Sequence, residues 1–140
     1  MGKTLALYFS AHWCPPCRGF NPNLVKVYNE LKERGEAFQI VLISTDRDQE
    51  AFEEYYNNMP WLALPFADKT KKDLSALFRV RSIPSLIMVG LDGKTLPDNA
   101  RNAVSTHGAK AYPFTDAHLE RLEKEIEEMV EKSPKEMRYS

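Results

Sequence analysis

The stretch Leu5–Cys17, LALYFSAHWCPPC, decides the fold class of this chain. Its first six residues, Leu5–Ser10, form a short apolar run that predicts a buried strand. Two cysteines follow, Cys14 and Cys17, with two prolines between them. Proline is tolerated in the first turn of a helix because its missing N–H needs no partner there. The stretch therefore predicts a strand that passes directly into a helix, with the cysteine pair at the junction.

Downstream, helical and strand-like segments alternate. Apolar spacing, β-branched runs and capping residues place their boundaries. After the first strand we expect a helix that bears Phe20, Leu24, Val27, Tyr28 and Leu31 and stops at Gly35. We then expect a strand at Phe38–Thr45, a helix that is capped by Asp46 or Asp48 and carries Phe52, Tyr55 and Tyr56, and a helix that begins with a Thr70/Asp73 capping box. The last predicted elements are a hairpin from Ser85–Gly90 through Asp92-Gly93 to Lys94–Leu96, a helix at Asn99–His107, and a helix capped by Thr115. This order predicts an α/β fold, a central mixed sheet flanked by helices on both faces.

Two further segments complete the layout. Met59–Phe66 contains two prolines in eight residues and is interpreted as an ordered loop. The apolar stripe of the last helix is interpreted as core or as a docking face. We expect one domain over residues 1–132 and a flexible tail over 133–140.

Composition narrows the function classes. The chain has 140 residues, 43% of them hydrophobic and 28% charged, as in an ordinary globular domain. Its net charge of −1 gives no electrostatic reason to expect nucleic acid or an anionic membrane as a partner. No apolar run approaches the roughly 20 residues of a membrane span, and no signal peptide is recognisable at the start. These features favour a reducing compartment.

The position of the cysteines favours reversible chemistry. A bridge across so short a loop stabilises a fold by only about 2 kcal/mol, against about 4.7 for a loop of 100 residues. At a helix N-terminus, however, the dipole and free N–H groups favour a thiolate at Cys14. Cys17 lies one turn later on the same side, within bridging distance. The pair therefore predicts a redox dithiol in which Cys14 attacks a disulfide and Cys17 resolves the mixed disulfide.

Other interpretations of the cysteine pair remain open at this point. One C-x-x-C supplies half of a structural zinc site, but His12, His107 and His118 lack the spacing of the other half. Two buried, unreactive cysteines are a second alternative. A thiol peroxidase is disfavoured because Ala11 stands where a hydroxyl residue would be needed.

Several motifs together resemble a known family. Trp13–Cys17 after a strand, with Ile83-Pro84-Ser85 before a later one, resembles the thioredoxin superfamily. Additional segments resemble its tryparedoxin/nucleoredoxin branch, and plant nucleoredoxin domains most of all. These segments are Tyr8–Phe20, Val41–Ser44, Asp46–Glu50, Met59–Phe66, Asn99–Arg101, His107–Ala109 and Tyr112–Thr115.

The resemblance implies a set of site residues and a thioredoxin fold. By analogy, Pro84 is cis and packs beside the disulfide, and the backbone of Ile83 pairs with the substrate chain. Trp13, Pro15 and Arg101 correspond to substrate-contacting positions. The buried Asp that thioredoxins carry six residues before the first cysteine is replaced here by Tyr8, so the group that takes the proton from Cys17 is open. Arg18 and His12 could add positive charge near Cys14 or be plain surface residues, whereas Trp61, Pro65 and Phe66 are interpreted as structural.

The resemblance also implies an activity, a protein-disulfide reductase of the cytoplasm or nucleus. It would bind no cofactor and would take electrons from NADPH through a thioredoxin reductase system. Its partners would be protein disulfides and that electron donor, and the chain would be a monomer or one domain of a multidomain protein. Two alternatives remain: a redox-sensitive binding module, and an oxidase or isomerase that runs the same chemistry in another direction.

Overall fold

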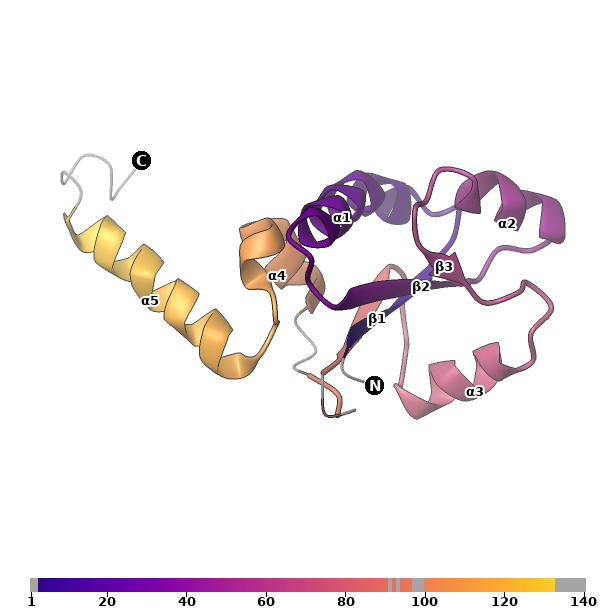
Figure 1. Ribbon diagram of the computed structural model, residues 1–140. Coiled ribbons are helices and arrows are strands. Elements are labelled where there is room, and N and C mark those ends of the chain that lie inside the picture. The colour runs from indigo at the N-terminus through magenta and orange to yellow at the C-terminus, as the bar shows by residue number, and fades with distance from the viewer. Residues whose placement is uncertain (1–2, 91, 93, 97–99, 133–140) are drawn as a thin grey trace.

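A central four-stranded sheet organises the chain. The computed structural model describes residues 3–90, 92, 94–96 and 100–132, and Figure 1 shows helices on both sides of the sheet. In chain order the elements are β1 (Thr4–Ser10), α1 (Pro15–Glu33), β2 (Phe38–Ser44), α2 (Gln49–Tyr56), β3 (Leu62–Ala63), α3 (Thr70–Leu77), β4 (Ser85–Val89), α4 (Ala100–His107), the short 3₁₀ helix η1 (Gly108–Ala111) and α5 (Asp116–Lys132).

The sheet is mixed, as expected from the sequence. Its strand order is β3-β2-β1-β4, in which β1 and β3 pair with β2 in parallel and β4 pairs with β1 antiparallel. In the register, Ser10 at the end of β1 lies opposite Ser44 at the end of β2. Phe9 lies opposite Ser85, the first residue of β4. The end of β1, the end of β2 and the start of β4 therefore meet at one edge of the sheet.

Alternation along β1 separates two apolar layers, because successive side chains of a strand point to opposite faces. Ala6 and Tyr8 belong to the larger core, which also contains the buried faces of α1, α2, α4 and η1. Leu7 and Phe9 belong to a smaller cluster that includes Leu74 of α3. Figure 1 shows the same division, with α3 alone on one side of the sheet and α1 and α2 on the other. The prediction of helices on both faces is confirmed.

Of the two predicted helix starts, the first is confirmed by one of its two candidate caps and the second is wrong in detail. Asp48, not Asp46, caps α2, with its Oδ1 accepting the Ala51 N–H at 2.8 Å. At α3, the backbone N–H and the hydroxyl of Thr70 both donate to Asp68 Oδ1, at 2.9 and 2.7 Å. The Thr70 hydroxyl is thus engaged by the preceding carboxylate and does not form a capping box with Asp73. In both cases an aspartate of the preceding loop holds the first turn.

The segment Met59–Phe66 is not wholly a loop. Between its two prolines, Leu62–Ala63 forms β3, which pairs in parallel with Val41 and Leu42 of β2. Two residues that keep their N–H groups are enough for this short edge pairing, and a proline on either side limits its length.

The chain returns along β4 as the hairpin prediction requires. Val89 and Thr95 form an antiparallel bridge, and the Gly90 N–H donates to the Lys94 carbonyl at 2.8 Å. Gly93 of the predicted turn lies outside the described residues.

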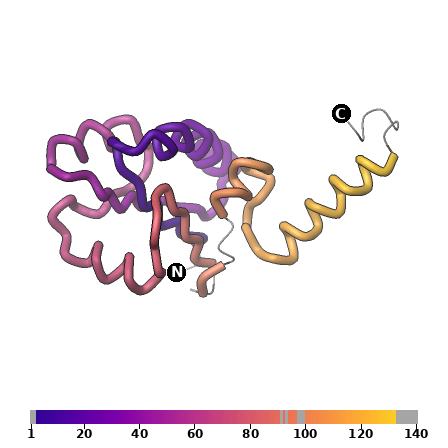
Figure 2. Tube along the Cα trace, turned by 180° about the vertical axis from the view of Figure 1, so that it is seen from behind, coloured from indigo at the N-terminus to yellow at the C-terminus, as the bar shows by residue number. Residues whose placement is uncertain are grey.

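The last helix follows the prediction in part. Thr115 Oγ1 accepts the His118 N–H at 3.3 Å, as expected of a cap. Leu119 is buried against the core, but Ile126 and Met129 are 44% and 70% exposed. Figures 1 and 2 show the reason, since α5 extends away from the body of the fold. The apolar stripe joins the core only over its first turns. The predicted tail, residues 133–140, lies outside the described residues.

Candidate active site

The cysteines lie where the ends of β1 and β2 meet the start of β4. The loop after β1 ends at Cys14, with Cys17 in the first turn of α1, the loop after β2 carries Thr45 and Asp46, and the loop before β4 carries Ile83 and Pro84. Strand pairing brings these three loops together although they are 30 to 70 residues apart in sequence (for example, Cys14 and Ile83 differ by 69). The site is a product of the mixed sheet.

Cys14 occupies the N-cap position of α1. Its backbone is extended (φ −95°, ψ 111°), and Pro15 and Pro16 form the first helical positions as predicted. The Arg18 N–H donates to the Cys14 carbonyl at 3.1 Å, which closes the first turn. The Cys14 side chain is 5% exposed. Its sulfur therefore lies at the positive end of the helix dipole, which favours a negative charge on it.

Cys17 lies one turn further on and is fully buried. Both cysteines are free thiols, and they pack together with Ala11 in one buried cluster. Burial raises the pKa of Cys17 to about 11, and the hydrogen bond with Cys14 adds to the rise. A hydrogen bond with Ser10 acts in the opposite direction. The structure thus brings the sulfurs together on one side of α1 and keeps the inner one protonated at neutral pH.

The Ile83–Pro84 segment forms the opposite wall. The Ile83–Pro84 peptide bond is cis, and Ile83 packs in a cluster with Ala11 and the two cysteines. The Cys14 thiol points to the Ile83 carbonyl, with 3.9 Å between sulfur and oxygen. Arg101 donates from Nη1 to the Pro84 carbonyl at 3.2 Å, so its guanidinium holds this wall from α4. The structure therefore places Ile83 against the cysteine pair, and Arg101 reaches this segment through the Pro84 carbonyl.

Trp13 forms an exposed apolar surface beside Cys14. It is 51% exposed, and its Nε1 donates to the Thr45 carbonyl at 3.4 Å. The guanidinium of Arg47 lies over the indole, 5.7 Å from the ring centroid. Pro15 is exposed next to it. An incoming chain can therefore contact the indole and Pro15 without displacing core residues.

The remaining candidates divide between surface and core. Arg18 is exposed, and His12 is half-buried. Trp61 is 2% exposed and meets Tyr8 and Tyr28 edge-on, so its interpretation as a structural residue is confirmed.

Sequence reasoning missed an aspartate that fixes the loop before the cysteines. Asp46 is 7% exposed, and its Oδ1 accepts the His12 N–H at 2.8 Å. Its Oδ2 accepts the Ser44 hydroxyl at 2.6 Å. Because Asp48 caps α2, the Asp46 carboxylate is available to join the end of β2 to the loop that carries Trp13. An acidic residue two positions after a mostly apolar strand was the available signal.

A buried group of hydroxyls was also missed. Ser10 Oγ and Tyr55 Oη lie 2.6 Å apart, and the Tyr8 hydroxyl donates to the Cys17 carbonyl at 3.5 Å. Tyr8 and Ser10 are two residues apart on β1 and so share one face. Their polar atoms therefore converge behind Cys17.

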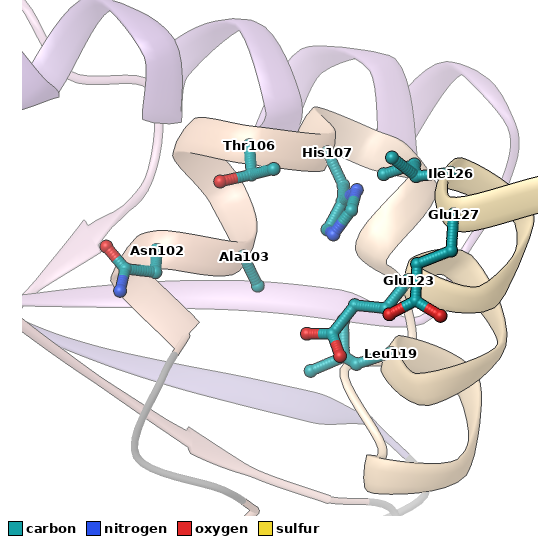
Figure 3. Close-up of a pocket in the computed structure, with 8 residues that line it drawn as sticks. All are labelled: Asn102, Ala103, Thr106, His107, Leu119, Glu123, Ile126 and Glu127. Carbon is teal, nitrogen blue, oxygen red and sulfur yellow. The ribbon is translucent and has the colours of Figure 1, made fainter. Parts of the chain in front are cut away.

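A large hollow of the described structure lies elsewhere. It has a volume of about 550 Å³ and opens between α4 and α5 (Figure 3). Its lining residues are Asn102, Ala103, Thr106, His107, Leu119, Glu123, Ile126 and Glu127. None of the residues that surround the cysteines takes part in it. Within the described parts of the chain, no group of three or more His, Cys, Asp and Glu side chains is placed to hold a metal ion.

Comparison with known proteins agrees with the fold. A family model described as thioredoxin-like matches residues 2–95, and the chain belongs to this family. Tryparedoxin II from C. fasciculata is 44% identical, with a TM-score of 0.75 over 82% of this chain and 81% of that one. Tryparedoxin from Trypanosoma brucei is 40% identical, with a TM-score of 0.74 over 83% and 82%. These matches confirm the thioredoxin fold and the tryparedoxin resemblance.

Nucleoredoxins are the curated relatives. The chain is 52% identical over 139 residues to "Probable nucleoredoxin 1" of Arabidopsis thaliana, and this match covers 99% of this chain and 24% of the relative. It is 42% identical over 115 residues to human nucleoredoxin, and this match covers 81% of this chain and 26% of the relative. The chain thus spans about a quarter of the length of the nucleoredoxins it matches. The chain is therefore a thioredoxin-like domain of the nucleoredoxin and tryparedoxin type, and its paired cysteines are consistent with a redox dithiol.

Proposed function

We propose that this chain reduces protein disulfides, with Cys14 as the nucleophile and Cys17 as the resolving cysteine. One observation carries the proposal: the two cysteines pack together at a helix N-terminus, beside the exposed indole of Trp13 and the carbonyl of Ile83. Membership of the thioredoxin-like family supports thiol–disulfide exchange as the reaction.

The reaction has two exchanges. The Cys14 thiolate attacks one sulfur of the substrate disulfide, and the other substrate sulfur leaves as a thiolate. Cys17 gives up its proton to that leaving thiolate or to solvent, and then attacks Cys14 Sγ. The mixed disulfide breaks, the second substrate sulfur leaves as a thiolate that water protonates, and a Cys14–Cys17 disulfide forms. The substrate gains two electrons, and the protein loses two.

Substrate positioning is assigned to the surface around Cys14. Trp13 and Pro15 offer exposed apolar area, and the backbone of Ile83 offers a carbonyl within reach of an extended chain. Arg101 supports this segment through the Pro84 carbonyl. An extended peptide that pairs with Ile83 would pass directly over Cys14.

Regeneration requires an external reductant. We propose an NADPH-dependent thioredoxin reductase system as its source, and protein disulfides of the cytoplasm or nucleus as substrates. The names of the nucleoredoxin relatives support the proposed location, and their greater length supports a role as one redox domain of a larger protein. No helix in the described part of the chain combines the length and apolarity of a membrane span.

Reduction of insulin by dithiothreitol tests the proposal. The wild-type chain should accelerate insulin reduction, and Cys14→Ser should abolish the acceleration because the attacking sulfur is gone. Cys17→Ser should accumulate a mixed disulfide with substrate, detectable as an added mass. A wild-type chain with no catalysis that nevertheless retains a partner only when reduced would instead identify a redox-sensitive binding module.

The direction of the chemistry needs a second measurement. Equilibration with glutathione gives the reduction potential of the dithiol, and about 30 mV corresponds to about 1.4 kcal/mol. A potential close to that of protein disulfide isomerase, about −180 mV, would favour the oxidase or isomerase alternative. A potential near about −270 mV, as in thioredoxin, is expected of a reductase.

A further inference from the structure

The resolving cysteine has a chemical difficulty that the structure makes visible. Cys17 is 0% exposed, and burial raises its pKa to about 11. At pH 7 only about one molecule in ten thousand would carry a Cys17 thiolate at equilibrium. Yet the thiolate is the form that attacks a disulfide. A group that stabilises negative charge at this sulfur would therefore accelerate the second exchange.

A serine hydroxyl lies close to this sulfur. Ser10, at the end of β1, is 0% exposed, and its hydroxyl lowers the pKa of the Cys17 thiol. The same oxygen lies 2.6 Å from the hydroxyl of Tyr55 on α2. The hydroxyls of Ser10 on β1 and Tyr55 on α2 are thus neighbours on the same side of the sulfur.

The protonation state of Tyr55 makes its hydroxyl an available donor in this pair. Burial, together with the nearby charge of Asp46, raises the pKa of Tyr55 above its ordinary value, so the phenol keeps its proton at neutral pH. Tyr55 can therefore donate to Ser10 Oγ, and Ser10 can then donate to Cys17 Sγ. Each donated bond makes the next donor stronger in a low-dielectric interior.

Four ionisable groups surround this pair. The Tyr8 hydroxyl interacts with Tyr55 from β1, and Asp46 approaches from the end of β2. The His12 ring stacks on Tyr55, with 5.5 Å between centroids. From α3, Lys71 Nζ donates to the Ser44 carbonyl at 3.0 Å.

We propose that Ser10 and Tyr55 form a hydroxyl pair that stabilises the Cys17 thiolate during the second exchange. Ser10 touches the reacting sulfur and is a catalytic residue, whereas Tyr55 acts through Ser10 and is a positioning residue. Neither hydroxyl is consumed. The Cys17 proton leaves with the first substrate thiolate or to solvent, and the hydroxyl pair donates hydrogen bonds to the charge left behind. The inference rests on the proposed roles of Cys14 and Cys17.

Reaction with Ellman's reagent, an aromatic disulfide, separates the two exchanges. Reduced protein should release thionitrobenzoate in two phases, the first from attack by Cys14 and the second from attack by Cys17. Tyr55→Phe removes one hydroxyl and should slow the second phase about tenfold near neutral pH, with the first phase unchanged, because a hydrogen bond to a charged group is lost or weakened. The pH midpoint of the second phase should rise.

Two variants of Ser10 and a control variant of Tyr28 test whether the effect comes from the hydroxyl pair. Ser10→Ala should slow the second phase at least as much, and Ser10→Thr should restore it because the hydroxyl returns. Tyr28→Phe is the matched control, since the Tyr28 hydroxyl bonds to Gln39 Oε1 at 3.2 Å and faces neither cysteine. If Ser10→Ala does not fold, the Tyr55→Phe profile alone decides.

The outcomes separate this inference from the proposed function. If Tyr55→Phe slows both phases equally, or leaves the pH profile of the second phase unchanged, the hydroxyl pair is merely structural and the inference is overturned. If Cys17→Ser keeps the second phase, the assignment of the resolving cysteine fails instead. Loss of the second phase in Cys17→Ser together with a normal Tyr55→Phe leaves the proposed function intact and rejects only the hydroxyl pair.

Discussion

Alkaline pH should destabilise the reduced protein through Cys17. Burial raises the pKa of this thiol from 9.0 to about 11, so the folded state retains a proton that the unfolded state releases. The resulting contribution to stability is complete below about pH 9 and is lost as the pH rises through about 11. Two pKa units at 1.36 kcal/mol each make the loss about 3 kcal/mol. This is a large share of the roughly 5–15 kcal/mol that stabilise a typical domain.

Urea unfolding of the reduced wild type and of Cys17→Ala, at about pH 8 and about pH 11, measures this contribution. Tyr8, Tyr55 and Lys71 also have shifted pKa values, but they are common to both proteins and cancel in the difference. Because half of the folded-state thiols are ionised at about pH 11, the wild type should lose about 2 kcal/mol more than the variant between the two pH values. Equal losses would refute the argument that Cys17 is held as a buried, protonated thiol.

Three further predictions address substrate contact, the loop anchor and the core. Trp13→Ala should lower kcat/KM for insulin severalfold but change the free energy of unfolding by less than about 0.5 kcal/mol, because the indole is half exposed; an equal loss of stability would make Trp13 structural. Asp46→Asn weakens charge-assisted bonds from His12 and Ser44 and should cost about 1–3 kcal/mol in urea unfolding; an unchanged midpoint would contradict the anchor role. Leu24→Ala, at a fully buried site on α1, should cost about 2–5 kcal/mol by thermal unfolding, and a cost under 1 kcal/mol would show that this core relaxes around the cavity.

Features set by neighbouring residues could be predicted from the sequence. The apolar spacing of α1 and the prolines after Cys14 placed that helix correctly, and Gly35 follows its end with a positive φ of 76°. The cap of α5 by Thr115 could be predicted for the same reason, because the Thr115 hydroxyl and the His118 N–H that it accepts are three residues apart. Such features depend on interactions within one turn of chain, which a sequence displays directly.

Features set by partners distant in sequence could not be predicted. Ser10 and Tyr55 are 45 residues apart, and nothing near either residue marks them as partners. Asp46 and Asp48 are both able to cap a helix, and only the contact of Asp46 with His12 across the sheet edge decides between them. β3 was missed because its pairing depends on the exposed edge of β2, which no local pattern records.

The different properties of the two cysteines follow from their positions on α1. Cys14, at the N-cap, has an extended backbone and lies against the Ile83 segment. Cys17 is the first member of the stripe that anchors α1 to the sheet, followed at helical spacing by Phe20, Leu24 and Tyr28. The packing that holds the helix on the sheet therefore also removes the second sulfur from water. Because the same burial raises the pKa of Cys17, its acidity and the stability of the fold are linked, and the hydroxyls of Ser10 and Tyr55 are the groups placed to counter that rise without opening the core.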